Sequence, residues 1–150
     1  MINLELVFPE IFLSLSIMFL LILGVFKTDS SKLIQNISLI VLLITAVITF
    51  NETLGVEEVL LFNESIIIDY LSSFMKIVTL LAAFLVLIIS SNYLRIFKIF
   101  KIEYPILILS SVLGMMVMIS SNDLIVFYMG LELQSLALYV LATFNRDQLK

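Results

Sequence analysis

The sequence predicts an all-α integral membrane protein with about five transmembrane helices. Of its 150 residues, 62% are hydrophobic and only 13% are charged, whereas charged residues make up roughly a quarter of a soluble domain. The apolar residues gather into runs of roughly 16 to 21 residues, close to the length that a helix needs to cross a bilayer. Residues 1–150 are therefore expected to form a single membrane domain.

The first two helices are expected over 8–26 and 33–50, joined by a short polar turn at 27–32. Pro9 lies where the first helical turn tolerates a missing N–H group. Glu10 follows it, where the positive end of the helix dipole favours a carboxylate. We therefore interpret Glu10 as a capping or interfacial charge.

The longest loop, 51–69, is acidic and contains no Lys or Arg. Its two apolar stretches, 59–62 and 66–68, are too short to span a bilayer. They are expected to form a hairpin or to pack on the membrane surface. A third helix is expected to follow over 70–89.

Lys76 is the one basic residue expected inside a span, about two turns from the start of the third helix. A Lys near a helix end can extend its ammonium group to the membrane interface, so outward snorkelling is the favoured interpretation. Pairing with Glu10 or Asp69 is the alternative. These three residues are candidate charges of the outer side.

The segment 93–103 carries Arg95, Lys98 and Lys101, interleaved with Leu, Ile and Phe. This amphipathic basic pattern is typical of a segment that lies at the lipid headgroups and binds anionic lipid such as cardiolipin. A partner-helix or calmodulin-type site is the less favoured reading of the same pattern.

The last two helices are expected over 105–120 and 123–143, with Pro105 marking the start of the fourth. Three small residues of the fourth helix should allow another helix to approach closely: Ser110, Ser111 and Gly114. The very short turn at 121–122 can cap the fifth helix. It also predicts that the fourth and fifth helices are antiparallel neighbours.

Glu132 lies near the midpoint of the fifth span, where a charged side chain costs roughly 3 kcal/mol on insertion scales. Helical spacing places Tyr128, Ser135 and Tyr139 on the same face. One interpretation is a structural carboxyl group that is hydrogen-bonded to a neighbour. We favour the other, a proton-transfer or ion-path residue, because ionisable groups inside a membrane are functional by default.

The sequence contains no Cys and no His. It therefore provides no disulfide, no Cys-bound iron–sulfur cluster and no His- or Cys-ligated haem or zinc, and no cofactor or metal site is expected in it. A net charge of −4 argues against nucleic-acid binding. The intramembrane charges are the remaining candidates for chemistry.

Three motifs occur in order: FPE at 8–10, IDYLSSFMK at 68–76 and EYP at 103–105. They are followed by the most specific stretch, GLELQSLALYVLA at 130–142. Together they closely resemble the NADH dehydrogenase subunit 2 family, the antiporter-like membrane subunits of respiratory complex I. The likeness covers the whole chain.

The resemblance implies a membrane subunit of H⁺-translocating NADH:ubiquinone reductase that carries no redox chemistry itself. It implies that the carboxylate of the fifth helix, here Glu132, joins a central axis of Glu and Lys residues. The implied partners are other complex I membrane subunits. The implied location is the mitochondrial inner membrane, or the bacterial inner membrane if the chain is not organellar.

The family continues beyond its fifth helix, and its later broken helices carry the lysines. We therefore expect a split subunit, in which a separate chain bears the remaining helices and the cationic partner of Glu132. A truncated remnant that does not pump is the alternative. Two further alternatives are a purely structural piece of the membrane arm and a subunit of a cation/proton antiporter.

The basic residues predict the topology. Of eight Lys and Arg residues, all except Lys76 fall in 27–32, in 93–103 or after residue 143. The positive-inside rule then places the N-terminus outside and the C-terminus inside. In this Cys-free chain, an impermeant maleimide should label Lys32→Cys only from the inner side and Glu64→Cys only from the outer side. Labelling of both from one side would contradict the five-span topology.

Overall fold

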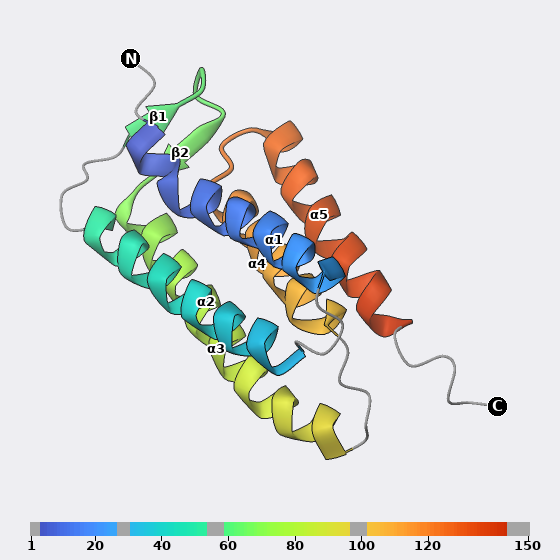
Figure 1. The fold of residues 1–150 in the computed structure, drawn as a ribbon. Coiled ribbons are helices and arrows are strands. Elements are labelled where there is room, and N and C mark those ends of the chain that lie inside the picture. Colours follow the sequence, from blue (N-terminus) through green and yellow to red (C-terminus); the bar gives the residue numbers. More distant parts are fainter. Residues whose placement is uncertain (1–3, 27–30, 54–58, 97–101, 144–150) are drawn as a thin grey trace.

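The computed structural model describes residues 4–26, 31–53, 59–96 and 102–143. A short 3₁₀ turn precedes five α-helices and one β-hairpin (Figure 1). In chain order the elements are the 3₁₀ turn Leu4–Val7, α1 (Phe8–Phe26), α2 (Ser31–Thr53), β1 (Val59–Leu61), β2 (Ile66–Ile68), α3 (Tyr70–Ile96), α4 (Glu103–Ile119) and α5 (Leu124–Ala142). The all-α prediction is confirmed.

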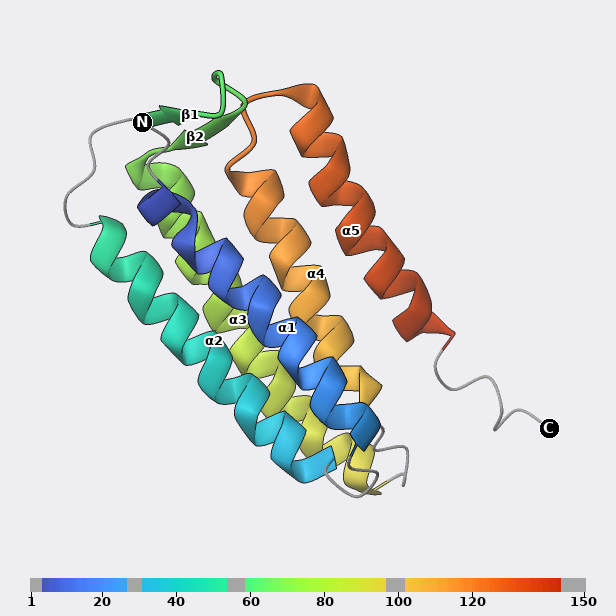
Figure 2. The ribbon, with the colours of Figure 1, turned by 45° about the horizontal axis from the view of Figure 1, so that its top comes forward.

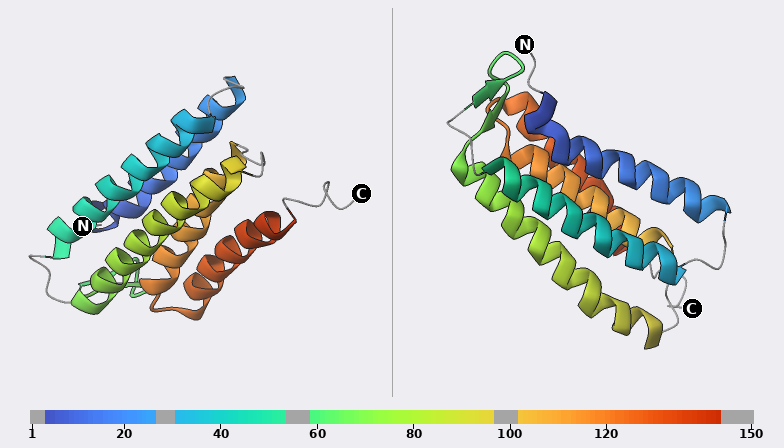
Figure 3. Two further views of the ribbon diagram at one scale, coloured as in Figure 1. Left: turned by 90° about the horizontal axis from the view of Figure 1, so that it is seen from below. Right: turned by 60° about the vertical axis from the view of Figure 1, so that its left-hand side comes forward.

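Helices α1 to α4 form an antiparallel four-helix bundle, and α5 lies outside it against α4 (Figures 2 and 3). Neighbouring helices pack around the bundle in the order α1, α2, α3, α4 and back to α1. Helices α1 and α3 are therefore diagonal to each other. The start of α1, the end of α2, the start of α3 and the end of α4 meet beside the β-hairpin (Figure 2). We call this the hairpin end of the bundle.

Four of the helices, α1, α2, α3 and α5, are long and apolar enough to cross a membrane by length and composition. The remaining helix, α4, is also apolar but has only 17 residues, which gives a length of about 26 Å at 1.5 Å per residue. The outward faces of the four longer helices carry large exposed Leu, Ile, Val and Phe side chains. An all-α integral membrane protein accounts for these faces, because lipid covers apolar surface that water would not.

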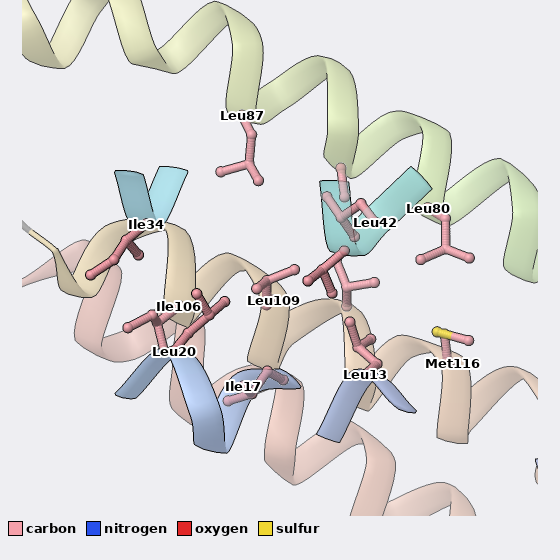
Figure 4. Packing of buried hydrophobic residues seen from close by; sticks show 13 residues of the cluster. Leu13, Ile17, Leu20, Ile34, Leu42, Leu80, Leu87, Ile106, Leu109 and Met116 are labelled. Carbon is pink, nitrogen blue, oxygen red and sulfur yellow. The ribbon is translucent and has the colours of Figure 1, made fainter. Parts of the chain in front are cut away.

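The core lies along the axis of the four-helix bundle (Figure 4). Each helix contributes apolar residues at three- and four-residue spacing, which brings them onto one face. Helix α1, for example, contributes Leu13, Ile17 and Leu20. At the hairpin end of this core, Leu13 and Leu80 gather with Met116 (Figure 4).

The β-hairpin connects α2 to α3, and its two strands pair antiparallel with Leu60 opposite Ile67. The hairpin interpretation of these apolar stretches is confirmed. The backbone N–H of Ile67 donates to the carbonyl of Ser120 at 2.9 Å, and the N–H of Asn122 donates to the carbonyl of Ser65 at 2.9 Å. The hairpin, which is part of the connection between α2 and α3, is therefore also hydrogen-bonded to the turn between α4 and α5.

Helix α3 is longer than the sequence suggested, since it continues past 89 to Ile96. The hydroxyl of Ser90 donates to the carbonyl of Leu87, and that of Ser91 donates to Ile88. Back-bonded hydroxyls let polar residues continue a helix, so the expected break is wrong. The headgroup segment expected at 93–103 starts as a continuation of α3, and its residues 97–101, with Lys98 and Lys101, lie outside the described residues.

Three other boundaries also differ from expectation. Helix α2 covers Ser31–Thr53 rather than 33–50. Helix α4 begins at Glu103, two residues before Pro105, because the N–H that Pro lacks needs no partner in a first turn. Helix α5 is capped by Asp123, whose carboxylate accepts from the N–H of Ile125, and not by residues 121–122.

Helices α4 and α5 approach each other more closely than side chains would normally allow. A Cβ atom added at Gly114 would lie 2.8 Å from the carbonyl oxygen of Gly130, and one added at Gly130 would lie 2.8 Å from the backbone N of Met118. The prediction of antiparallel neighbours with a small-residue contact is confirmed at Gly114. Gly114 and Gly130 therefore let the backbones of α4 and α5 come into contact. We call this contact the glycine seam.

We expect Gly130→Ala to weaken the α4–α5 contact by about 1–3 kcal/mol, because the added methyl group meets backbone that cannot move aside cheaply. The free energy of unfolding in detergent measures this cost. Gly24→Ala is the matched control, since its Cβ would meet side chains and not backbone, that of Ile102 at 2.8 Å and that of Ile34 at 3.6 Å. Equal stability of the two variants would contradict the seam.

Candidate functional site

A buried ion pair joins the diagonal helices α1 and α3 at the hairpin end. The ammonium of Lys76 lies 2.5 Å from Oε1 of Glu10. Lys76 is 3% exposed and Glu10 is 8% exposed. Because α1 and α3 pack mainly on α2 and α4 rather than on each other, this pair is a direct link across the bundle.

The pair corrects two expectations. Lys76 does not snorkel outward, because α1 presents an acid to it across the bundle interior. Glu10 does lie in the first turn of α1, but its side chain is buried rather than interfacial. Asp69 is not the partner of Lys76, since its carboxylate accepts from the N–H of Ser72 at 2.7 Å at the start of α3.

Helical register places further polar residues at the level of this pair. Glu10 lies one turn beyond Leu13, and Lys76 lies one turn beyond Leu80, both members of the apolar core. On the other two helices, Ser120 lies one turn beyond Met116, and Thr49 lies near the end of α2. Thr49 and Ser120 are buried as well. We call these four residues the polar layer: Glu10, Thr49, Lys76 and Ser120.

Breaking the pair should cost far more than removing it. We expect Lys76→Met to lower the free energy of unfolding by about 3–5 kcal/mol, because it leaves a buried carboxylate without its cation. The double variant Glu10→Leu/Lys76→Met should be about as stable as the unchanged protein. Chemical unfolding of all four members of this double-mutant cycle in detergent gives the coupling. Additive costs would show that the two charges are independent.

Glu132 lies near the middle of α5, eight residues or about 12 Å from its start. Gly130 and Ala137 are the buried residues of α5 and mark the face that contacts α4. At about 100° per residue, Glu132 is about 200° around the helix from Gly130. The carboxylate therefore lies on the face opposite α4, and it makes no hydrogen bond or ion pair with the described residues.

The residues that share a face of α5 with Glu132 are not enclosed by the bundle either. Tyr128 is 61% exposed and Tyr139 is 66% exposed, and Ser135 is half-buried. The hydroxyl of Ser135 donates to the backbone carbonyl of Glu132 at 3.0 Å, so it is engaged within the helix. We call Tyr128, Glu132, Ser135 and Tyr139 the polar stripe. The structure places this stripe on a face of α5 that α1 to α4 do not enclose.

Lys76 is not a partner of Glu132, although the two lie at similar distances from the starts of their helices. Counted from the start of each helix, Lys76 is about 9 Å into α3 and Glu132 about 12 Å into α5. The two are separated laterally, because Lys76 points into the bundle toward Glu10 and Glu132 lies beyond α4. The distance of a residue from the start of its helix therefore does not indicate which charged residues pair in this protein.

Among the buried polar residues that the sequence interpretation did not identify, Gln35 makes a long-range contact. Gln35 of α2 donates from Nε2 to the backbone carbonyl of Leu87 of α3 at 3.1 Å. An amide in an otherwise apolar helix is the signal that would have indicated it. Elsewhere, α3 and α4 enclose an apolar groove of about 210 Å³, lined by residues that include Ala83, Ser111 and Met115. Its lining contains no titratable group.

No group of three or more Asp, Glu, Cys or His side chains that could hold a metal ion occurs among the described residues. The candidate site residues inside the helices are two carboxylates and a lysine: Glu10, Glu132 and Lys76. The charges of the Glu10–Lys76 pair offset each other, whereas Glu132 is half-buried and forms no ion pair with the described residues. Proton uptake and release is the reaction that such a carboxylate can perform.

The amino-acid sequence matches no protein-family model. It does match curated relatives named NADH-quinone oxidoreductase subunit N. It is 65% identical to that of Pelagibacter ubique over 148 residues, which is 99% of this chain and 31% of the relative. It is 45% identical to that of Maricaulis maris over 150 residues, 99% of this chain and 31% of the relative.

The chain is similar to subunit N of bacterial NADH-quinone oxidoreductases. A third relative, from Paramagnetospirillum magneticum, is 46% identical over 142 residues, 94% of this chain and 29% of the relative. The chain thus spans about a third of the length of these relatives. Their name is subunit N rather than subunit 2, and their sources are bacteria, so they lend no support to a mitochondrial location.

Proposed function

We propose that this chain contributes to the proton-translocating, antiporter-like subunit N of an NADH-quinone oxidoreductase, respiratory complex I. Within it, Glu132 is a proton-accepting group of the proton path. The similarity to subunit N over nearly the whole chain supports the enzyme complex. The single observation that carries the proton role is a carboxylate near the middle of α5, on a face that the other described helices do not cover.

The chemistry follows from the cost of charge in hydrocarbon. An ionised Glu132 requires a cation or several hydrogen-bond donors within reach, whereas the protonated acid requires much less. A partner that approaches or withdraws would therefore change whether Glu132 holds a proton. This coupling needs no cofactor in this part of the protein, and electron transfer would occur in other subunits.

The uncovered face of α5 also indicates the partners. The relatives are about three times as long as this chain, so they have further sequence that can supply helices for this face. We propose that such helices cover Tyr128, Glu132 and Tyr139 and provide the cation. The proposal holds for helices of the same polypeptide and for those of a separate chain.

Other membrane subunits of the same complex are the further proposed partners, and the bacterial inner membrane is the proposed location. Anionic lipid at the basic segment around Arg95 stays a prediction. The matched relatives are oxidoreductase subunits, which favours the oxidoreductase over a cation/proton antiporter. Co-purification of this chain with the subunits of the oxidoreductase would separate these two.

We expect Glu132→Gln to leave the complex assembled but to lower proton-coupled turnover roughly tenfold or more, because the amide cannot exchange the proton. Proton uptake into inverted vesicles, driven by NADH oxidation, measures this. Glu64→Gln, in the exposed hairpin turn, is the control for loss of a carboxylate.

Ser135→Ala is a second control. Its hydroxyl bonds only to the backbone of α5 among the described residues, so we expect turnover to remain near that of the unchanged protein. Full proton-coupled activity in an assembled Glu132→Gln complex would overturn the proton role. It would leave the structural, non-pumping alternative.

A further inference from the structure

The hairpin end of the bundle contains a buried acceptor without a donor. Oε2 of Glu10 has almost no accessible surface and accepts no hydrogen bond from any described residue. Oε1 of the same carboxylate is engaged by Lys76. An ionised carboxylate offers about four lone-pair sites, and buried polar atoms in native proteins nearly always have a partner. Another donor is therefore needed beside Oε2.

The surroundings restrict what this donor can be. A metal cation is disfavoured, because the ammonium of Lys76 occupies the other side of the same carboxylate. An anion is excluded by the charge of Glu10 itself. The apolar layer of Leu13, Leu80 and Met116 borders the pair one turn further into the bundle. A small neutral donor satisfies all of these conditions.

We propose that the polar layer binds a buried water molecule, which donates to Oε2 of Glu10. Water is small and neutral, and buried waters typically bond to groups that would otherwise be unsatisfied. In the same layer, the hydroxyl of Ser120 donates its own proton to the carbonyl of Met116, so its oxygen is still able to accept a hydrogen bond from water. The site lies on α1 and its neighbours, away from Glu132 on α5.

This water makes the ion pair a stable link between diagonal helices. A buried pair persists only when its remaining lone pairs and protons are also satisfied. With Oε2 satisfied, Glu10 and Lys76 hold the start of α1 against α3 at a point where α1 has no extensive packing on α3. The link does not depend on the proton role of Glu132.

The direct test is a high-resolution cryo-EM map of the assembled complex that contains this chain. We expect density for one water within hydrogen-bond distance of Glu10 Oε2. A protein donor at Oε2, or a dry carboxylate oxygen, would overturn the proposal. This measurement uses the unchanged protein and so does not depend on whether any variant folds.

A labelling experiment gives a second readout. Met116 is 0% exposed, and hydroxyl radicals generated from ¹⁸O water by X-rays should oxidise it only if water lies nearby. We expect ¹⁸O incorporation at Met116 in the unchanged complex, and a several-fold loss in Glu10→Leu/Lys76→Met, which removes the acceptor and its cation together.

Gln35→Leu is the matched control, because it removes the other unpartnered buried side-chain oxygen of the described residues, Oε1 of Gln35. This control should leave the labelling of Met116 unchanged. Absence of label in the unchanged complex would overturn the water site. Equal label in the double variant would show that the pair does not hold the water.

Discussion

Hydrocarbon offers no hydrogen-bond partner, so each polar group inside the membrane must find one within the protein. The chain meets this constraint mainly with helices, whose backbone groups bond within one segment. The buried hydroxyls of Ser38, Thr45 and Thr49 donate to carbonyls one turn earlier in α2. The β-hairpin, with its less complete backbone pairing, stands at the end of the bundle rather than within its length (Figure 1).

The same constraint divides the protein into two parts. In the bundle α1–α4, the buried charges of Glu10 and Lys76 are paired with each other across the interior. Helix α5 contacts α4 through a glycine seam and presents its polar stripe on the opposite side. The surroundings of Glu132 must therefore come from whatever packs on α5, which is the arrangement expected of a group that responds to a partner.

The two candidate carboxylates have different surroundings: Glu10 lies in the first turn of α1, whereas Glu132 lies near the middle of α5. Glu10 is held by a lysine of its own bundle and links α1 to α3, two helices that pack little on each other. Glu132 has no cation among the described residues, which is compatible with the proton role proposed for it. The difference lies in which face of its helix each acid occupies and in what that face contacts.

The sequence by itself determined the number and the approximate positions of the helices and offered the hairpin as one of two alternatives, because hydrophobic runs and helical period are local properties. It also indicated the close approach at Gly114, since small residues at helical spacing have few other uses. The predicted end of α3 at residue 89 was wrong, because the hydroxyls of Ser90 and Ser91 form hydrogen bonds within the helix. Only the tertiary structure decided the partner of Lys76. Glu10, Asp69 and the membrane interface were all within reach by sequence, and the choice depended on α1 lying diagonally opposite α3.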